Sequence, residues 1–212
     1  MKSGLILFNK KTGITSFDAL RDIKRALGTG KVGHTGTLDK FAHGLLIVLC
    51  GNSLKLSRWF TGCDKQYIAK IRFGVETDTL DPEGNVTGTS ILPSREQVEN
   101  VLMQFKGSIL QAPPVYSAIH INGKRASDIA RSGVLLEMKK RPVTIYKLEV
   151  ISWEPPFAEM YVHCSSGTYI RSLARDIAVS AGSKGHLVSL LRTNVGNFDL
   201  KNACKEENIG DI

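Results

Sequence analysis

A glycine-rich loop that leads directly into an apolar segment is the feature that most constrains the fold of this chain. Residues 33–39 read GHTGTLD, and residues 45–49 read LLIVL. The apolar segment is too hydrophobic for an exposed strand, so we expect it in the middle of a sheet. Glycine permits tight turns and the close approach of a ligand, and Thr35 and Thr37 can bond to the loop backbone. The pattern predicts a sheet that presents one carboxylate, Asp39, on an ordered loop.

Hydrophobic periodicity predicts strands and helices on both sides of this loop. The clearest helix spans residues 94–105, where Ser94 and Gln97 have the spacing of a capping box. Strands and helices alternate without a regular βαβ rhythm, which favours an α+β domain with a mixed, largely antiparallel central sheet flanked by helices. The other predicted strands cover residues 4–10, 45–49, 67–73, 143–151, 158–164 and 187–191, and the other helices cover 16–27, 52–59, 127–131 and the segment after 167.

Length and charge indicate the kind of partner. A chain of 212 residues can bury one good core, so we expect residues 1–212 to form a single domain. The 28 Lys and Arg exceed the 20 Asp and Glu, which gives a net charge of +8 and a pI near 9.4. Such a balance suits a polyanion such as nucleic acid.

Several classes of function lack their sequence motifs. The chain has no Walker loop and no G-x-G-x-x-G after a strand, its five histidines lack metal-ligand spacing, and its four cysteines form no C-x-x-C pair. We therefore expect no metal and no cofactor. The apolar run near the N-terminus is too short for a signal peptide, and no later segment reaches the length of a membrane span. We expect a cytoplasmic protein that does not enter a membrane.

The character of the sequence changes between residues 111 and 141. This segment contains two consecutive prolines, the tight-turn pair Asn122-Gly123 and the basic run at 139–141. We expect it to protrude and to grip an acidic partner. A solvated, charged loop without a partner is the alternative that composition alone leaves open.

The loop at 33–39 and the segments that follow it resemble the TruB family of tRNA pseudouridine synthases. The resemblance covers about residues 4–198 and implies the pseudouridine synthase fold. It also implies that the substrate is the T-arm loop uridine (U55) of tRNA and that no cofactor is used. We expect the protein to be a monomer. The matching segments are GHTGTLD at 33–39, DKQY at 64–67, TDT at 77–79 with Asp81, PVYS at 114–117 with Gly123-Lys124, Arg141-Pro142, and CSSGTYIR at 164–171.

The resemblance assigns three residues to catalysis. Asp39 is the nucleophile, which either attacks the base at C6 or captures C1′ as the glycosidic bond breaks. Arg171 is expected to pair with Asp39 and keep it ionised, because a nearby cation favours the charged carboxylate. Tyr67 is expected to stack on the target base, near the site from which the C5 proton leaves. From the residues alone, Asp39 is also readable as a turn or cap residue, Arg171 as an exposed arginine and Tyr67 as a strand aromatic.

Four further residues match family positions that bind the substrate. The target base is flipped out of the folded RNA loop into the pocket, and His34 is expected to occupy the vacated space. Tyr169 and Leu190 are expected to line the uridine pocket, and Lys10 matches a lysine near the active site. Each of them is also readable as an ordinary structural residue.

The chain departs from the family pattern in a few places. Lys40 follows the catalytic Asp39 where proline is common, Lys10-Lys11 replaces a Lys-Pro pair, and Leu191-Arg192 replaces consecutive arginines. Proline would stiffen the first two loops. We expect no C-terminal PUA domain, so residues 111–141 and the basic surface would hold the T-arm stem-loop of tRNA by salt-sensitive phosphate contacts.

Two other functions remain open at this point. The chain could be a non-catalytic module that binds RNA or assists tRNA folding, or a pseudouridine synthase that acts on another RNA such as rRNA. A binding module has no need for Asp39, Tyr67 and Arg171 as a set, which favours the enzyme.

Overall fold

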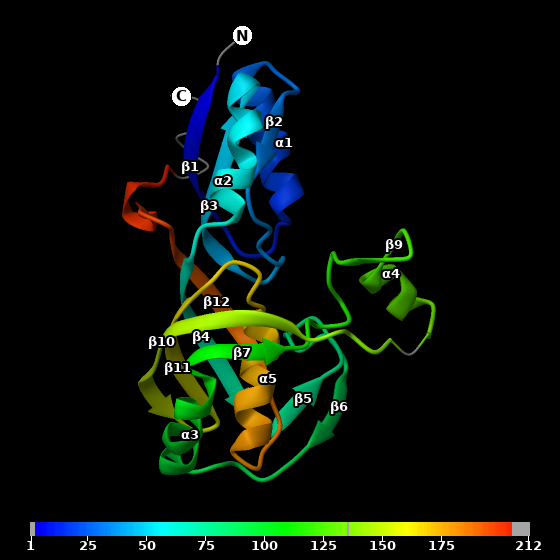
Figure 1. The fold of residues 1–212 in the computed structure, drawn as a ribbon, viewed down its shortest axis with the longest axis vertical. Helices are drawn as coiled ribbons and strands as arrows, with labels where there is room; N and C mark the ends of the chain where they lie inside the picture. Colours follow the sequence, from blue (N-terminus) through cyan, green and yellow to red (C-terminus); the bar gives the residue numbers. More distant parts are fainter. Residues whose placement is uncertain (1–2, 135, 205–212) are drawn as a thin grey trace. The chain divides into compact units, whose positions relative to one another are not determined.

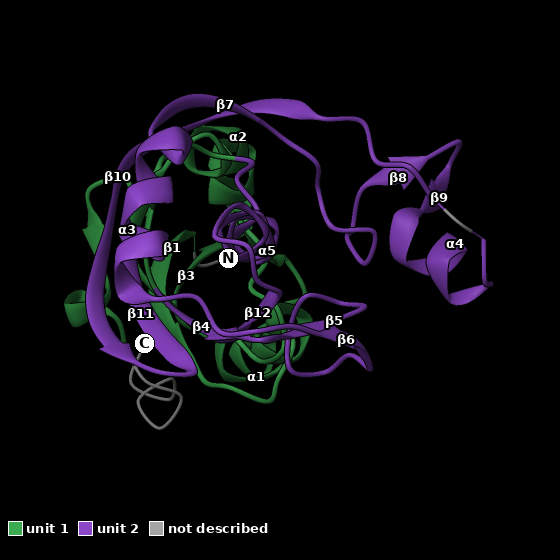
Figure 2. Cartoon of the chain, turned by 90° about the horizontal axis from the view of Figure 1, so that it is seen from below, with its two compact units in different colours: residues 1–68, 162–166, 189–212 green, residues 69–161, 167–188 purple. Residues whose placement is uncertain are grey.

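The chain is described here from a computed structural model, in which residues 3–134 and 136–204 are placed. Figure 1 shows the fold of the chain. Figure 2 marks its two compact units, each of which is assembled from segments that are far apart in the sequence. Unit 1 comprises residues 1–68, 162–166 and 189–212, and unit 2 comprises residues 69–161 and 167–188. No helix within the described ranges has the length and hydrophobicity needed to cross a membrane. The expectation of a single domain stays a prediction.

Unit 1 is built around β3 (His43–Cys50), the strand that follows the glycine-rich loop. β1 (Gly4–Lys10) and β2 (Val32–His34) pair with β3 in antiparallel orientation, whereas β12 (Gly185–Val195) runs parallel to it. Side chains of β3 alternate between two buried clusters: Leu46 and Val48 enter one, and Leu45, Ile47 and Leu49 enter the other. The apolar run therefore occupies the middle of a sheet, as its composition predicted.

The helices of unit 1 begin and end at local sequence signals. α1 (Ser16–Leu27) starts at a capping box between Thr15 and Asp18 and ends at Gly28, which has a left-handed conformation. Its buried face packs on the cluster that contains Leu46. Instead of one helix over 52–59, the chain forms a 3-10 turn and then a short α-helix. The smaller elements are η1 (Gly51–Leu56), α2 (Ser57–Thr61), β13 (Phe198–Asp199) and η3 (Leu200–Asn202).

Unit 2 contains four neighbouring strands in the order β4-β11-β10-β7. β7 and β10 are antiparallel, so the sheet as a whole is mixed and largely antiparallel, as predicted. α3 packs against α5 and β10. β4, β11 and β12 contribute residues to both units. The bounds are β4 (Lys65–Phe73), β5 (Val75–Thr77), β6 (Val86–Thr89), α3 (Arg95–Leu102), η2 (Met103–Phe105), β7 (Gly107–Gln111), β10 (Arg141–Glu154), β11 (Phe157–Cys164) and α5 (Ile170–Ser180).

The segment at 111–141 extends away from the rest of unit 2 (Figure 2). It carries the hairpin of β8 (His120–Ile121) and β9 (Lys124–Arg125), followed by α4 (Ala126–Arg131). Asn122 and Gly123 have φ values of 50° and 82°, which is the backbone of the tight turn that their sequence predicted. Residue 135 of this segment lies outside the described residues.

Gly44 allows three strands to meet at the end of the loop. It faces Lys10 of β1 and Arg192 of β12, and its φ of +106° is unfavourable for other residues. A Cβ atom at this position would overlap the backbone oxygen of Arg192 and lie 2.9 Å from its backbone nitrogen. Because both obstacles belong to the backbone of a paired strand, neither can rotate away.

We therefore expect Gly44→Ala to lower the free energy of unfolding by about 3 kcal/mol, from strain and overlap together. Gly13→Ala serves as a control for backbone strain alone, because Gly13 has a φ of +88° with no atom near its added Cβ, and it should cost about 1 kcal/mol. Gly4 has neither a left-handed φ nor an atom close to an added Cβ, so Gly4→Ala should change the free energy of unfolding by less than about 0.5 kcal/mol. Urea denaturation of the three variants measures this order, and equal losses at positions 44 and 13 would contradict the steric argument.

Candidate active site

The Asp39 loop lies between β2 and β3 and is fastened to α1 directly before the carboxylate. Ser16, which is buried in the first turn of α1, accepts a hydrogen bond at Oγ from the Leu38 amide at 2.9 Å and donates one to the Leu38 carbonyl at 3.0 Å. The Ala42 amide then donates to the Asp39 carbonyl at 3.1 Å. These bonds hold the backbone on both sides of Asp39, while its side chain stays half-buried.

Arg192 of β12 fastens the same loop from another side. Its side chain donates to the carbonyl of Leu45 at 2.7 Å, to that of Gly36 at 3.1 Å and, more weakly, to that of Thr37 at 3.4 Å. Arg192 is only 3% exposed. One guanidinium thus joins the residues before Asp39 to those after it.

Tyr67 of β4 lies within electrostatic reach of both Arg192 and Asp39. Burial raises the pKa of the Tyr67 phenol, and the negative charge of Asp39 raises it further. Arg192 opposes these effects through its positive charge and a side-chain hydrogen bond. The net direction is upward, so the phenol keeps its proton at neutral pH. Unit 1 therefore brings together the Asp39 carboxylate, which can act as a nucleophile, and a neutral Tyr67.

The other residues that the sequence assigned to unit 1 are found on the strands around this loop. Lys10 is fully buried at the end of β1, where its Nζ donates to the carbonyls of Lys11 at 3.0 Å and Ile14 at 2.7 Å. His34 ends β2 half-buried; burial and then the charge of Arg192 lower its pKa, and its buried Nδ1 makes no hydrogen bond. Leu190 is buried on β12.

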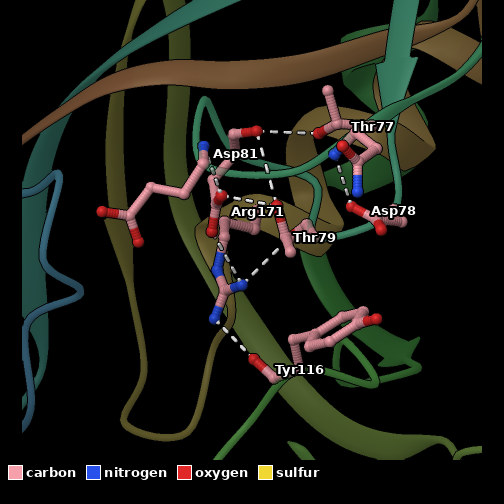
Figure 3. Close-up of polar contacts among 8 residues, drawn as sticks. Thr77, Asp78, Thr79, Asp81, Tyr116 and Arg171 are labelled. Atoms are coloured by element: carbon pink, nitrogen blue, oxygen red, sulfur yellow. Dashed lines mark hydrogen bonds and ion pairs between the residues drawn. The ribbon is translucent and has the colours of Figure 1, made fainter. Parts of the chain in front are cut away.

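In unit 2, Arg171 binds the turn at residues 77–84 (Figure 3). Its guanidinium lies 3.0 Å from the Asp81 carboxylate and also donates to the carbonyls of Thr79 at 2.9 Å and Tyr116 at 3.0 Å. The side chains of Arg171 and Asp81 are each 7% exposed. The pair is therefore a buried ion pair with further hydrogen bonds, and such a pair tolerates the loss of one partner poorly.

The turn that holds Asp81 is also bonded to itself. Asp81 accepts at Oδ1 from the Thr79 hydroxyl at 2.5 Å and from the Glu83 amide at 3.0 Å. The Thr77 hydroxyl donates to the Asp81 carbonyl at 2.8 Å. Figure 3 shows these contacts converging on Asp81. The turn's own hydrogen bonds thus help to hold the carboxylate that faces Arg171.

The start of the protruding segment is attached to α5 beside Arg171. The Gln111 amide group accepts from the Tyr169 amide at 2.8 Å and donates to the Tyr169 carbonyl at 3.1 Å. The Ser172 hydroxyl donates to the Ala112 carbonyl at 2.8 Å. Tyr169, which was expected to line the pocket, therefore has a fixed backbone at the start of the helix that carries Arg171.

The expected pair of Arg171 and Asp39 joins residues of different units and stays a prediction, as do the substrate contacts of His34, Tyr169, Leu190 and Lys10. Sequence reasoning did not identify Arg192, Ser16 or Asp81 as parts of the site. For Arg192 a signal existed, because an arginine inside an apolar strand is rare without partners. Within the described ranges, no group of three His, Cys, Asp or Glu side chains could hold a metal ion.

Solved structures define the class of protein. A chain in "Crystal Structure of a Cbf5-Nop10-Gar1 Complex" superimposes with a TM-score of 0.77 at 26% identity, over 98% of this chain and 54% of that one. A chain in "Crystal structure of pseudouridylate synthase" gives a TM-score of 0.53 at 18% identity, over 97% of this chain and 68% of that one. The protein has the pseudouridine synthase fold, and it spans about half the length of the first of these chains.

Sequence comparison then gives the family. Residues 24–170 match the model of the TruB family pseudouridylate synthase N-terminal domain. The "tRNA pseudouridine synthase B" of Borreliella burgdorferi is 46% identical over 212 residues, which covers 99% of this chain and 75% of the relative. The protein with the same name from Francisella tularensis is 42% identical and is covered to 70%. The chain belongs to the TruB family of pseudouridine synthases, which are isomerases.

Proposed function

We propose that this protein isomerises the T-arm loop uridine (U55) of tRNA to pseudouridine, with Asp39 as the nucleophile. The observation that carries the proposal is the Asp39 loop: its backbone is fixed by the buried Ser16 and Arg192, and a neutral, buried tyrosine lies within electrostatic reach. The relatives named as tRNA pseudouridine synthases support the choice of RNA.

The reaction needs little more than a positioned carboxylate. The N1–C1′ bond of uridine breaks, the base turns over, and C5 bonds to C1′ while the C5 proton leaves to solvent, so no electrons are gained or lost. Asp39 forms a transient bond either to C6 of the base or to C1′ of the sugar, and this bond breaks again before product forms. Tyr67 stacks on the base near C5, and Arg171 keeps Asp39 ionised.

The substrate base must leave its RNA stack to reach Asp39. Flipping costs a few kcal/mol of lost stacking, and His34 recovers part of it by filling the vacated space. Because its pKa is lowered, the imidazole is neutral at pH 7 and can stack without a charge to solvate. Tyr169 and Leu190 line the pocket that receives the uridine, and Lys10 lies near the active site.

The segment at 111–141 grips the T-arm stem-loop. It carries the exposed Lys124 and Arg125 on the β8–β9 hairpin, and a hollow of about 880 Å³ lies between this hairpin and α4. Together with the net charge of +8, these groups favour contact with phosphates and make the affinity fall as salt increases. The protein acts as a monomer, which sedimentation equilibrium with and without RNA would test.

Tritium release from C5-labelled uridine tests the function directly, because the C5 proton leaves only when C5 bonds to the sugar. We expect release from a T-arm stem-loop, and no release when its target uridine is replaced by cytidine. Gel-shift binding is measured on the same RNAs. Binding without release would identify a non-catalytic RNA module, and release only from an rRNA hairpin would identify a synthase for another RNA.

A further inference from the structure

Arg192 is a buried arginine whose side chain joins both ends of the catalytic loop. It bonds the carbonyls of Gly36 and Thr37 before Asp39 and the carbonyl of Leu45 after it. These three bonds join residues that are 147 to 156 positions apart in the sequence.

The arrangement of the three carbonyls around this side chain suits an arginine in particular. A guanidinium has five N–H donors in a rigid plane, so it can bond several carbonyls that point in different directions. Its own backbone is fixed, because Arg192 lies opposite Gly44 in the parallel pair of β3 and β12. A lysine would supply the charge on a flexible chain with one nitrogen, which cannot reach all three carbonyls at once.

The same guanidinium also acts on the residues around Asp39. Its charge lowers the pKa of the Tyr67 phenol, and it lowers the pKa values of His34 and Lys65 after the larger effect of burial. The charge of Arg192 is therefore felt at the tyrosine, at the histidine and at a buried lysine. Its side chain itself is 3% exposed, so it does not form part of the surface that meets RNA.

We propose that Arg192 is a positioning residue of the isomerisation, which holds Asp39 and Tyr67 in one reactive arrangement without touching the RNA. This inference rests on the proposed function. Lys40 occupies the position after Asp39 where a proline would restrict the backbone, so the loop needs another source of rigidity. Reactions between held groups depend steeply on position, and a displacement of 1 Å can lower a rate by about 10²-fold.

Arg192→Lys separates positioning from general folding. We expect its single-turnover rate of tritium release to fall by about 10²-fold, while its Kd for the T-arm stem-loop changes by less than about twofold. The matched control is Ile23→Ala, which weakens the core of unit 1 on α1, two turns beyond Ser16. Assayed well below its melting temperature, this control should keep its rate within about threefold of the wild type.

Hydrogen exchange provides a readout that does not depend on activity. The amides of Thr35, Leu38 and Ala42 are bonded within or beside the loop. We expect peptides over residues 33–44 to exchange at least about tenfold faster in Arg192→Lys than in the wild type. Peptides over α1 should exchange as in the wild type. In Ile23→Ala, peptides over α1 should exchange faster than in the wild type, and peptides over residues 33–44 should exchange as in the wild type.

The outcomes distinguish this inference from the function on which it rests. If the wild type releases no tritium from any RNA, the proposed function is wrong, and exchange of residues 33–44 still decides whether Arg192 holds the loop. If the wild type is active but Arg192→Lys matches Ile23→Ala in rate, or leaves loop exchange unchanged, the inference is overturned. Should Arg192→Lys fail to fold, Arg192→Gln takes its place under the same criteria.

Discussion

Asp39→Asn is expected to lower tritium release from the T-arm stem-loop by a factor on the order of 10⁴ or more, while RNA binding stays within about threefold. The amide has nearly the shape of the carboxylate, and the loop bonds at Leu38 and Ala42 involve backbone atoms that the change leaves in place. What the variant lacks is an anionic oxygen that can form the transient covalent bond. The loss should therefore appear in the rate at which the RNA-bound enzyme releases tritium.

The matched control for this prediction is Asp22→Asn on the surface of α1. Asp22 forms ion pairs with Arg21 and Arg25, both of which are well exposed, and such pairs contribute little. This variant should keep its full rate. Mass spectrometry must confirm that the asparagine at position 39 has not deamidated, and Asp39→Ala removes that route entirely. Release within about tenfold of the wild type from both position-39 variants would contradict the assignment of the nucleophile.

Local signals in the sequence were sufficient to predict most of the elements. The Ser94 and Gln97 pair does form a capping box, and Asn122-Gly123 does form the hairpin turn. In each case the residues that determine the geometry are close in the sequence, so their pattern is visible without a structure. Element ends were less exact: α3 stops at Leu102 and continues as a 3-10 turn to Phe105.

The supports of the catalytic loop were not predictable in the same way. Glycines and threonines at 33–39 indicated an ordered loop, but the groups that order it are Ser16 on α1 and Arg192 on β12. They bond backbone carbonyls and amides, which every residue possesses, so nothing in the loop sequence points to them. The absence of proline at position 40 suggested a looser loop, whereas hydrogen bonds from distant segments provide the restraint.

Arg171 shows which part of a pair a sequence can reveal. The motif at 164–171 singled out the arginine, but the carboxylate that it meets in unit 2 is Asp81, 90 positions earlier in the chain. Residues 77–84 contain Pro82 and Gly84 at positions typical of a turn, and this pattern does not identify a partner for Arg171. In the structure the hydroxyls of Thr77 and Thr79 bond to Asp81 and hold it in place.

Asp81→Asn is expected to destabilise the protein by about 3 to 5 kcal/mol. The amide keeps an oxygen for the Thr79 hydroxyl and the Glu83 amide, but its NH₂ group then faces the donors of the Arg171 guanidinium. The buried guanidinium thereby loses the negative charge of Asp81 and meets a second donor. Because the pair is buried, salt screens it weakly, and the loss should persist in 0.5 M NaCl.

Urea denaturation, with Asp78→Asn as the matched control, measures this effect. Asp78 lies in the same turn but is exposed. Its Oδ1 accepts a hydrogen bond from the Asn85 amide, and the side-chain oxygen of an asparagine can accept the same bond. The control should therefore lose less than about 1 kcal/mol. A double-mutant cycle with Arg171→Met isolates the pair, and we expect the double variant to lose at least about 1 kcal/mol less than the two single losses added. Additive losses, or an Asp81→Asn variant no less stable than Asp78→Asn, would mean that Arg171 gains no stability from Asp81.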